Sequence, residues 1–195
     1  MKTLVIVTHP NMEQSKVNKR FLEEIKKQEE VTVHELYKEY PDEKIDIEKE
    51  QELLLQHDRI VLQFPFYWYS SPSLLKKWQD SVLTYGWAYG PKGNKLNGKE
   101  LVLAVTTGGP ENSYVAGGYN NYSLSELLKP FQATSNLIGA TYLTPFIFNG
   151  AVVASEDDIE KGAKAYIAHA LNPELDPKVA LSNLTKKMEQ EGIEL

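Results

Sequence analysis

The chain has 195 residues and no cysteine, and its 42% hydrophobic and 25% charged residues are ordinary for one globular domain. The absence of cysteine excludes disulfides, thiolate zinc sites, iron–sulfur clusters and a cysteine nucleophile. The formal net charge of −6 argues against non-specific binding to nucleic acid or to an anionic membrane.

Charge and aromatic residues are distributed unevenly along the chain. Residues 59–154 contain seven basic and four acidic residues and 16 of the 20 aromatic residues, whereas both flanking segments are acidic. A weakly positive, aromatic centre fits a flat, anionic ligand, although the same residues can simply fill a core.

No targeting or membrane signal is visible. Residues 1–7 lack the longer apolar stretch and the cleavage site of a signal peptide. No stretch approaches the roughly 20 apolar residues that span a bilayer. We expect a cytoplasmic protein without membrane insertion.

Apolar runs and amphipathic stretches alternate along the chain. Buried or alternating runs predict strands at 4–7, 31–36, 59–64, 101–105 and 141–148. Helical spacing and capping residues predict helices that follow Ser15 and Asp46, cover 73–83, run from Ser123 to near Gly139, and run from Ser155 to about Leu171. Pro130 lies inside the fourth helix and should kink or break it.

This alternation predicts an α/β fold with a doubly wound, five-stranded parallel sheet and helices on both faces. We expect one domain over residues 1–175 and a polar C-terminal tail over 176–195 with helical potential from Lys178.

Ligands of such sheets bind outside the carboxyl ends of the strands, so the loops there are the candidate site. The first loop, residues 8–18, is polar and enters a helix N-terminus, where backbone N–H groups and the helix dipole favour an anion. His9, Ser15 and Asn18 can add side-chain donors. The alternative is that Ser15 is only a helix cap and His9 only a turn residue.

The second loop, residues 65–72, has four consecutive aromatic residues between two prolines. Aromatic side chains on such a rigid loop suit stacking on a planar heterocycle, but they are also typical of subunit interfaces. The third loop begins Thr106, Thr107, Gly108 and Gly109, where adjacent glycines let the backbone approach a ligand closely. Together the three loops predict one pocket with an anion end and a flat-ring end, which is the outline of a flavin mononucleotide.

Other chemistries have little support. No residues have metal-ligand spacing, so we expect no metal, and no serine-hydrolase elbow is present. His34, His57 and His169 fall on separate elements, and we expect them to be surface or capping residues.

Four blocks of the sequence resemble the flavodoxin-like NAD(P)H:quinone oxidoreductases. The blocks are His9-Pro10 with Ser15 and Asn18, then Pro65-Phe66-Tyr67-Trp68-Tyr69, then Trp87-Ala88-Tyr89-Gly90, and then Thr106-Thr107-Gly108-Gly109. The resemblance extends from Met1 to about Leu171. The length resembles the short bacterial branch, which includes general stress oxidoreductases and ancillary subunits of potassium-efflux systems, more than DT-diaphorase.

The resemblance implies a flavodoxin-like sheet of order 2-1-3-4-5 and a flavin-binding domain over 1–175. It implies a homodimer that holds a flavin, with FMN favoured by the short chain and FAD left open. It also implies reduction of quinones by NADH or NADPH, through two-electron hydride transfer in a ping-pong mechanism. The alternatives are a regulatory flavin-binding subunit that docks peripherally on a potassium-efflux transporter, and an electron carrier like flavodoxin.

The resemblance also assigns residues to parts of the flavin. To the phosphate side it assigns His9, Ser15, Lys16, Val17 and Asn18. To the isoalloxazine it assigns Pro65, Phe66, Tyr67, Trp68, Thr106, Thr107, Gly108 and Gly109. Tyr114 fits the catalytic tyrosine of the family, whereas the histidine expected after it has no counterpart in this chain.

Overall fold

Buried aliphatic runs form the parallel sheet of the computed structural model, which describes residues 1–191. The strands are β1 (Thr3–Val7), β2 (Val31–Glu35), β3 (Arg59–Pro65), β4 (Glu100–Thr106), β5 (Thr141–Tyr142) and β6 (Phe146–Phe148). They pair in parallel in the order β2-β1-β3-β4-β5, and β6 also pairs with β4. The predicted flavodoxin-like fold and strand order are confirmed.

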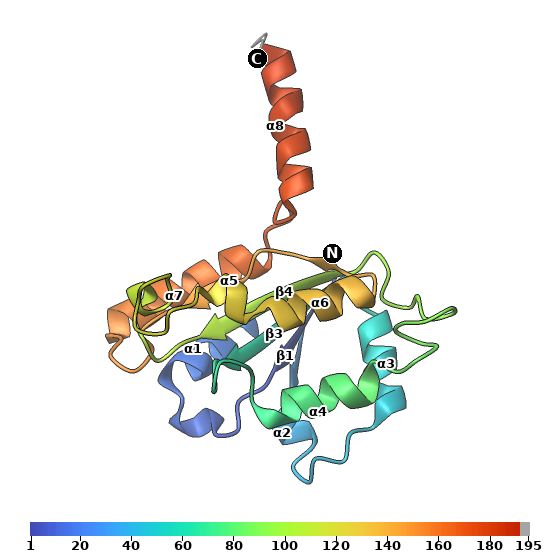
Figure 1. Ribbon diagram of the computed structural model, residues 1–195, viewed down its shortest axis with the longest axis horizontal. Helices are drawn as coiled ribbons and strands as arrows, with labels where there is room; N and C mark the ends of the chain where they lie inside the picture. The colour runs from blue at the N-terminus through green and yellow to red at the C-terminus, as the bar shows by residue number, and fades with distance from the viewer. Residues whose placement is uncertain (192–195) are drawn as a thin grey trace.

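Alternate residues of β1, β3, β4 and β6 point into two separate hydrophobic cores. Leu4 and Ile6 of β1 point into one core, whereas Val5 and Val7 point into the other. The first core is covered by α2 (Leu36–Glu39), α3 (Ile47–Leu55), α4 (Ser73–Val82), α5 (Leu124–Leu127) and α6 (Lys129–Leu137). The second is covered by α1 (Lys16–Ile25) and α7 (Glu156–Ala170), so helices lie on both faces of the sheet (Figure 1).

The helices begin at the predicted capping residues. Ser15 Oγ accepts the N–H of Asn18 at 3.2 Å, and Asp46 Oδ1 accepts the N–H of Lys49 at 3.1 Å. Ser155 heads α7 with a reciprocal pair of hydrogen bonds to the third helical residue. Single 3₁₀ turns, η1 (Met12–Gln14) and η2 (Glu111–Ser113), lie in the loops after β1 and β4.

Two predicted elements are divided in the structure. The strand expected at 141–148 is split into β5 and β6 around Pro145, which has no N–H for the ladder, and the carbonyl of Thr144 accepts His169 Nε2 at 2.8 Å. The helix expected from Ser123 is broken at Leu128 into α5 and α6, with Pro130 in the first turn of α6. The strand expected at 31–36 ends one residue earlier, because Leu36 begins α2.

Two histidines expected to be surface or capping residues, His34 and His57, are buried. His57 joins α3 to β2, with Nδ1 2.8 Å from the Leu53 carbonyl and Nε2 2.7 Å from Thr32 Oγ1. His34 lies in the first core beside a buried carboxylate. His57 is a capping residue as well, because its ring reaches the Leu53 carbonyl of α3. The burial of the two rings was not predicted, since Thr32 and Glu50, which lie beside them, are distant in the sequence.

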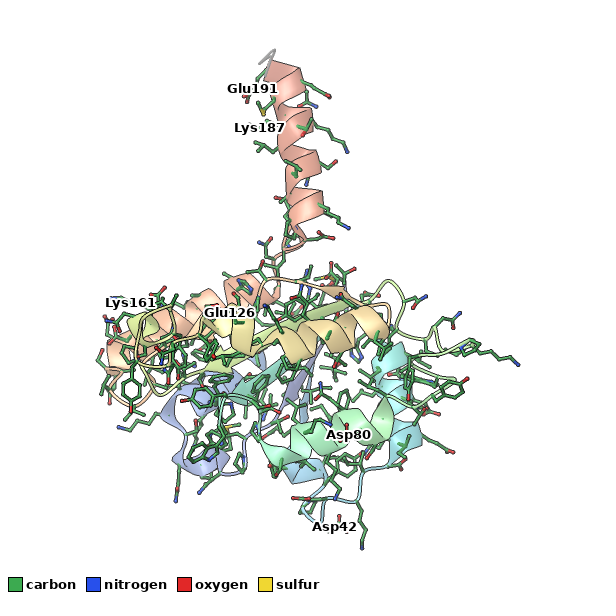
Figure 2. The ribbon with its side chains drawn as sticks, viewed as in Figure 1. Asp42, Asp80, Glu126, Lys161, Lys187 and Glu191 are labelled. Carbon is green, nitrogen blue, oxygen red and sulfur yellow. The ribbon has the colours of Figure 1, made fainter. Side chains whose placement is uncertain are left out.

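The C-terminal helix α8 (Pro177–Glu191) projects away from the sheet and contributes nothing to either core (Figure 1). Its side chains, including Lys187 and Glu191, extend outward from the isolated helix (Figure 2). Residues 192–195 of the expected tail lie outside the described residues. Among residues 1–191, no helix combines the length and the apolar character that a membrane crossing needs.

A buried carboxylate organises the first core. Glu50 is fully buried and accepts hydrogen bonds from Tyr40 Oη at 2.6 Å and Trp78 Nε1 at 2.7 Å, while His34 Nε2 lies 2.9 Å away. Burial alone raises the pKa of Glu50, but the contacts with His34, Tyr40 and Trp78 outweigh burial and hold the pKa below its ordinary value of 4.5.

Glu50→Gln should therefore lower the free energy of unfolding at pH 7 by about 2–4 kcal/mol, because it leaves buried donors poorly matched. A carboxyl with a lowered folded pKa stabilises the protein above its unfolded pKa, and this contribution is lost as the pH falls through the folded pKa. The difference between wild type and variant should thus shrink as the pH falls below 4.5.

Urea unfolding between pH 7 and pH 3 measures this difference. Glu52→Gln is the matched control, because Glu52 lies exposed on the same helix and should leave stability unchanged. A Glu50→Gln protein as stable as the control at pH 7 would contradict the assigned role.

Candidate functional site

The three loops predicted from the sequence meet at one cavity. It has a volume of about 360 Å³ and lies where β1, β3 and β4 end, at the carboxyl edge of the sheet. Eleven of the predicted site residues line it: His9, Ser15, Lys16, Val17, Asn18, Pro65, Phe66, Tyr67, Thr106, Thr107 and Gly108. The structure therefore brings the expected anion end and the expected flat-ring end into one space.

The first turn of α1 forms the anion end. The amides of Lys16 and Val17 occupy helix positions whose N–H groups have no carbonyl partner within the helix, and both residues line the cavity. The hydroxyl of Ser15 accepts from the Asn18 amide, which leaves the hydroxyl proton available for donation. Lys16 adds a positive charge at the same place.

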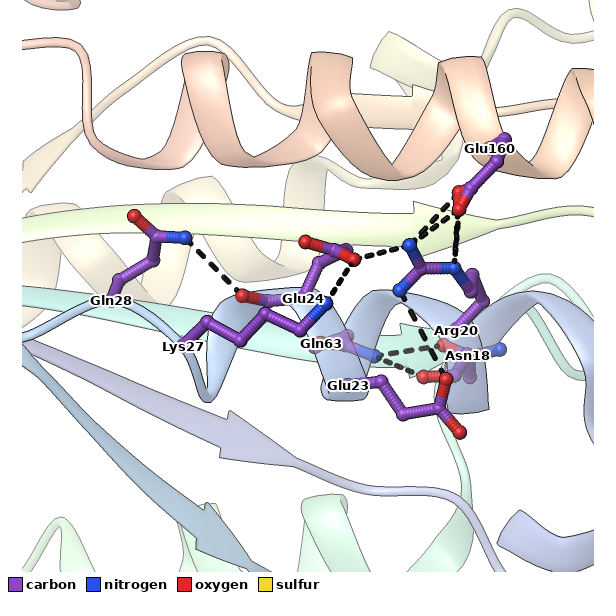
Figure 3. A network of polar contacts seen from close by, with 8 residues as sticks. All are labelled: Asn18, Arg20, Glu23, Glu24, Lys27, Gln28, Gln63 and Glu160. Atoms are coloured by element: carbon purple, nitrogen blue, oxygen red, sulfur yellow. Dashed lines mark hydrogen bonds and ion pairs between the residues drawn. The ribbon is translucent and has the colours of Figure 1, made fainter.

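Asn18, which was expected to donate to the anion, makes buried hydrogen bonds to two strands instead. It is only 2% exposed, and its Nδ2 donates to Thr106 Oγ1 at 2.9 Å. Gln63 Nε2 donates to its backbone carbonyl at 3.1 Å and lies 3.4 Å from its side-chain oxygen (Figure 3). Asn18 thus ties α1 to β3 through its backbone and to β4 through its side chain, and only the remaining N–H of Nδ2 is available toward the cavity.

His9 supplies a neutral donor beside the anion end. Its Nδ1 accepts the N–H of Asn11 at 3.1 Å, so the proton of a neutral ring resides on Nε2. Burial lowers the pKa of His9, which favours this neutral form near pH 7. The ring contacts Tyr67 edge to face, with centroids 6.2 Å apart.

Aromatic rings and glycine backbone form the flat end. The ring of Phe66 packs edge to face on Tyr114 and on Tyr69, with centroids 6.0 Å and 6.2 Å apart. A Cβ placed on Gly109 would lie 3.4 Å from the Tyr114 ring, so this tyrosine lies over the Gly-Gly turn. The hydroxyl of Tyr69 donates to Asn120 Oδ1 at 3.1 Å and thereby links the second loop to the third.

The hydroxyls of the third loop are already engaged. Thr106 Oγ1 accepts from Asn18, and Thr107 Oγ1 lies 2.8 Å from Asn149 Oδ1. The two threonines therefore shape the loop, and Gly108 brings bare backbone to the cavity wall.

Three predicted residues, Tyr114, Gly109 and Trp68, lie outside the cavity lining. Gly109 lies behind Gly108 and beneath Tyr114. Trp68 is 94% exposed, at the tip of a tight hairpin closed by two hydrogen bonds between Tyr67 and Ser70, of 3.1 Å and 3.0 Å. Trp68 and Tyr69 both have positive φ, 49° and 61°, which costs on the order of 1–3 kcal/mol at each non-glycine residue.

The sequence reasoning missed part of the wall. Gln14 and the segment after β6 also line the cavity, the latter through Ala151, Val152 and Ala154. Backbone bonds from Gly150 to Gly109 and from Ala151 to Thr107, of 2.8 Å and 2.9 Å, hold this segment against the third loop. The loop after the fifth strand ends at the same sheet edge, and that position was the available signal.

These residues fit a phosphate joined to a planar ring. Unpaired helix amides, a hydroxyl and a lysine are the donors that a phosphate needs, and the rings and glycine backbone flank a flat slot. Within residues 1–191, no group of three His, Asp or Glu side chains is placed to hold a metal ion.

A protein-family model described as "Flavodoxin-like fold" matches residues 1–170. The chain therefore belongs to the flavodoxin-like fold family. General stress protein 14 of Bacillus subtilis (strain 168) is 60% identical over 89% of this chain and 99% of its own. The NAD(P)H oxidoreductase YdeQ of the same organism is 55% identical over 97% of this chain and 96% of its own. The potassium-efflux ancillary protein KefG of Serratia proteamaculans is 42% identical over 88% of this chain and 94% of its own.

The chain is also similar to solved structures. The general stress protein 14 of Treponema denticola, in complex with FMN, is 45% identical with a TM-score of 0.82, over 86% of this chain and 97% of that one. An NADPH-quinone reductase from P. pentosaceus is 38% identical with a TM-score of 0.81, over 88% and 99%. A chain in the crystal structure of a thermophilic tryptophan halogenase from Streptomycin violaceusniger is 57% identical with a TM-score of 0.85, over 87% and 98%.

Proposed function

We propose that the protein is an FMN-dependent NAD(P)H oxidoreductase that reduces quinone-type acceptors by two-electron transfer in a ping-pong mechanism. The observation that carries this proposal is the single cavity that joins an unpaired helix N-terminus to aromatic and glycine walls. The relatives named NAD(P)H oxidoreductase and NADPH-quinone reductase support the activity, and the FMN complex of a 45% identical protein supports the cofactor.

The residues divide between the two ends of the cofactor. His9, Ser15, Lys16 and Val17 would bind the phosphate, and Asn18 holds this turn in place. Pro65, Phe66 and Tyr67 together with Thr106, Thr107 and Gly108 would hold the isoalloxazine, with the exposed Trp68 nearby on the second loop. When bound, FMN supplies the hydride chemistry that the chain's own side chains lack.

The walls of the flat slot determine the order in which the two substrates bind and leave. Phe66 lines the flat end and packs edge to face on Tyr114, and an aromatic wall of this kind favours planar partners. Because the same slot serves the nicotinamide and the quinone, the oxidised nicotinamide leaves before the quinone enters, which is ping-pong kinetics. Donors at the edge of the slot stabilise negative charge that develops on the ligands there.

Steady-state oxidation of NADH and NADPH with a soluble quinone, on the purified protein without added flavin, tests the proposal. We expect a yellow protein with about one FMN per chain and parallel double-reciprocal lines. Intersecting lines would reject the ping-pong mechanism, and a colourless protein that takes up no flavin would reject the whole proposal.

The same assay distinguishes two other functions. KefG relatives support a second candidate, a regulatory subunit that docks on a transporter, for which the exposed Trp68 hairpin offers a contact surface. Rapid turnover by the isolated protein argues against a purely regulatory role. Turnover without tryptophan and halide separates reductase activity from the halogenase that one similar structure is named for.

Ser15→Ala should raise the dissociation constant for FMN by about tenfold or more, since a hydrogen bond to a charged group contributes roughly 1.5–3 kcal/mol. Asp46→Ala is the matched control, because it also removes a helix cap but lies on α3 away from the cavity. Asn18→Ala should mainly lower the unfolding free energy, because it removes the donor to Thr106 Oγ1 and the 3.4 Å contact of Gln63 Nε2 with the side-chain oxygen. Flavin titration showing unchanged affinity in the Ser15→Ala, Asn18→Ala double variant would place the phosphate elsewhere.

Tyr114→Phe should slow hydride transfer by about tenfold or more while flavin content is unchanged. The substitution removes the hydroxyl and keeps the ring on Phe66, and a positioned acid contributes about 10²–10⁴-fold, with the lower end expected without a histidine partner. Stopped-flow reduction by NADPH measures the step. Rates within about twofold of wild type in both half-reactions would make Tyr114 a wall of the pocket.

We also propose a homodimer. Trp68, Tyr85, Tyr119 and Tyr122 are 57–94% exposed, and a monomer rarely leaves so many large rings in water. Light scattering at micromolar concentration should give about twice the chain mass of 22.1 kDa, and a value near 22.1 kDa would contradict the dimer.

A further inference from the structure

The turn that follows β6 is hydrogen-bonded to the Gly-Gly turn at the flat end of the cavity. The Thr107 N–H donates to the Phe148 carbonyl, and the Thr107 carbonyl accepts the Ala151 N–H, both at 2.9 Å. The Gly150 N–H donates to the Gly109 carbonyl at 2.8 Å. Three backbone bonds therefore join the two turns.

A side-chain contact completes this connection. The hydroxyl of the fully buried Thr107 lies 2.8 Å from Asn149 Oδ1 and 2.9 Å from the Gly109 carbonyl oxygen. Gly150 can direct its N–H toward the third loop because its φ is 74°, a conformation that costs other residues about 1–2 kcal/mol. We call residues 149–151 the clamp.

The clamp orients the N–H groups of the Gly-Gly turn. The peptide bonds of residues 1–191 are all trans, and a trans peptide points its N–H opposite to its C=O. Because Ala151 binds the Thr107 carbonyl, the N–H of Gly108 points away from the clamp. Gly108 lines the cavity, and within residues 1–191 neither its N–H nor that of Gly109 has a hydrogen-bond partner. Unpaired N–H groups beside a cavity indicate an acceptor on the ligand.

We infer that Asn149 is a positioning residue whose clamp makes the site favour the reduced form of the flavin ring, an inference that rests on the proposed flavin site. A hydride adds two electrons and one proton, so the ring gains one negative charge on reduction. N–H dipoles that are already fixed stabilise such a charge more than mobile ones, because they need not reorganise as the charge develops. Asn149 itself does not line the cavity, so it acts through the turn that it holds.

The midpoint potential of the flavin on the purified protein, measured against a reference dye, tests the inference. Asn149→Ala and Gly150→Ala should each weaken binding of the reduced flavin relative to the oxidised flavin at least about fivefold, which lowers the potential by about 20 mV for a two-electron couple. Thr107→Val removes the hydroxyl that Asn149 contacts, so adding Asn149→Ala to it should lower the potential no further.

Gly98→Ala is the matched control. Gly98 also has a positive φ, 77°, with no atom within 4 Å of the added Cβ, and it lies outside the cavity lining. It should lower thermal stability about as much as Gly150→Ala and leave the potential at the wild-type value. Circular dichroism and titration with oxidised FMN verify that each variant is folded and takes up the cofactor.

Three results would overturn the inference: a wild-type potential in both clamp variants, an equal shift in Gly98→Ala, or additive shifts from Asn149→Ala and Thr107→Val. The last result would mean that Asn149 does not act through the Thr107 hydroxyl. A wild-type protein that binds no flavin would instead reject the proposed function, so the two failures are distinguishable.

Discussion

A short chain of buried hydrogen bonds, from Gln63 to Asn18 and from Asn18 to Thr106, fixes the geometry on which the site depends. It links β3 to the first turn of α1 and that turn to the end of β4, where the third loop begins. The parallel register places Val7 opposite Gln63 and Pro65 opposite Thr106, so the strand ends arrive at one edge. The hydrogen bonds then set the distance between the helix amides and the walls of the flat slot.

The first and second turns of helix α1 differ in their electrostatics. The first turn offers uncompensated amides to an anion, whereas one turn later Arg20 is fully compensated by carboxylates.

The sequence predicted the fold well because buried parallel strands and capped amphipathic helices leave strong local patterns. It also predicted most of the site lining, since the strand order of this fold determines which loops meet. Local patterns did not show that Asn18 is a tie between elements, because Gln63 and Thr106 lie 45 and 88 residues away. The burial of His34 and His57 and the wall at Ala151 and Val152 depend on the same kind of distant contact. The backbone angles of Trp68 could not be read either, because a two-residue turn with positive φ ordinarily carries Asn-Gly.

That turn has a consequence for laboratory evolution. Trp68 and Tyr69 occupy left-handed conformations that Asn and Gly adopt with far less strain, and the Trp68 side chain packs against almost nothing within its own chain. A library randomised at these two positions and selected only for heat resistance should converge on Asn-Gly. The same library selected for turnover should keep an aromatic residue. Comparison of the two enriched pools would separate the contribution of the hairpin to stability from its contribution to activity.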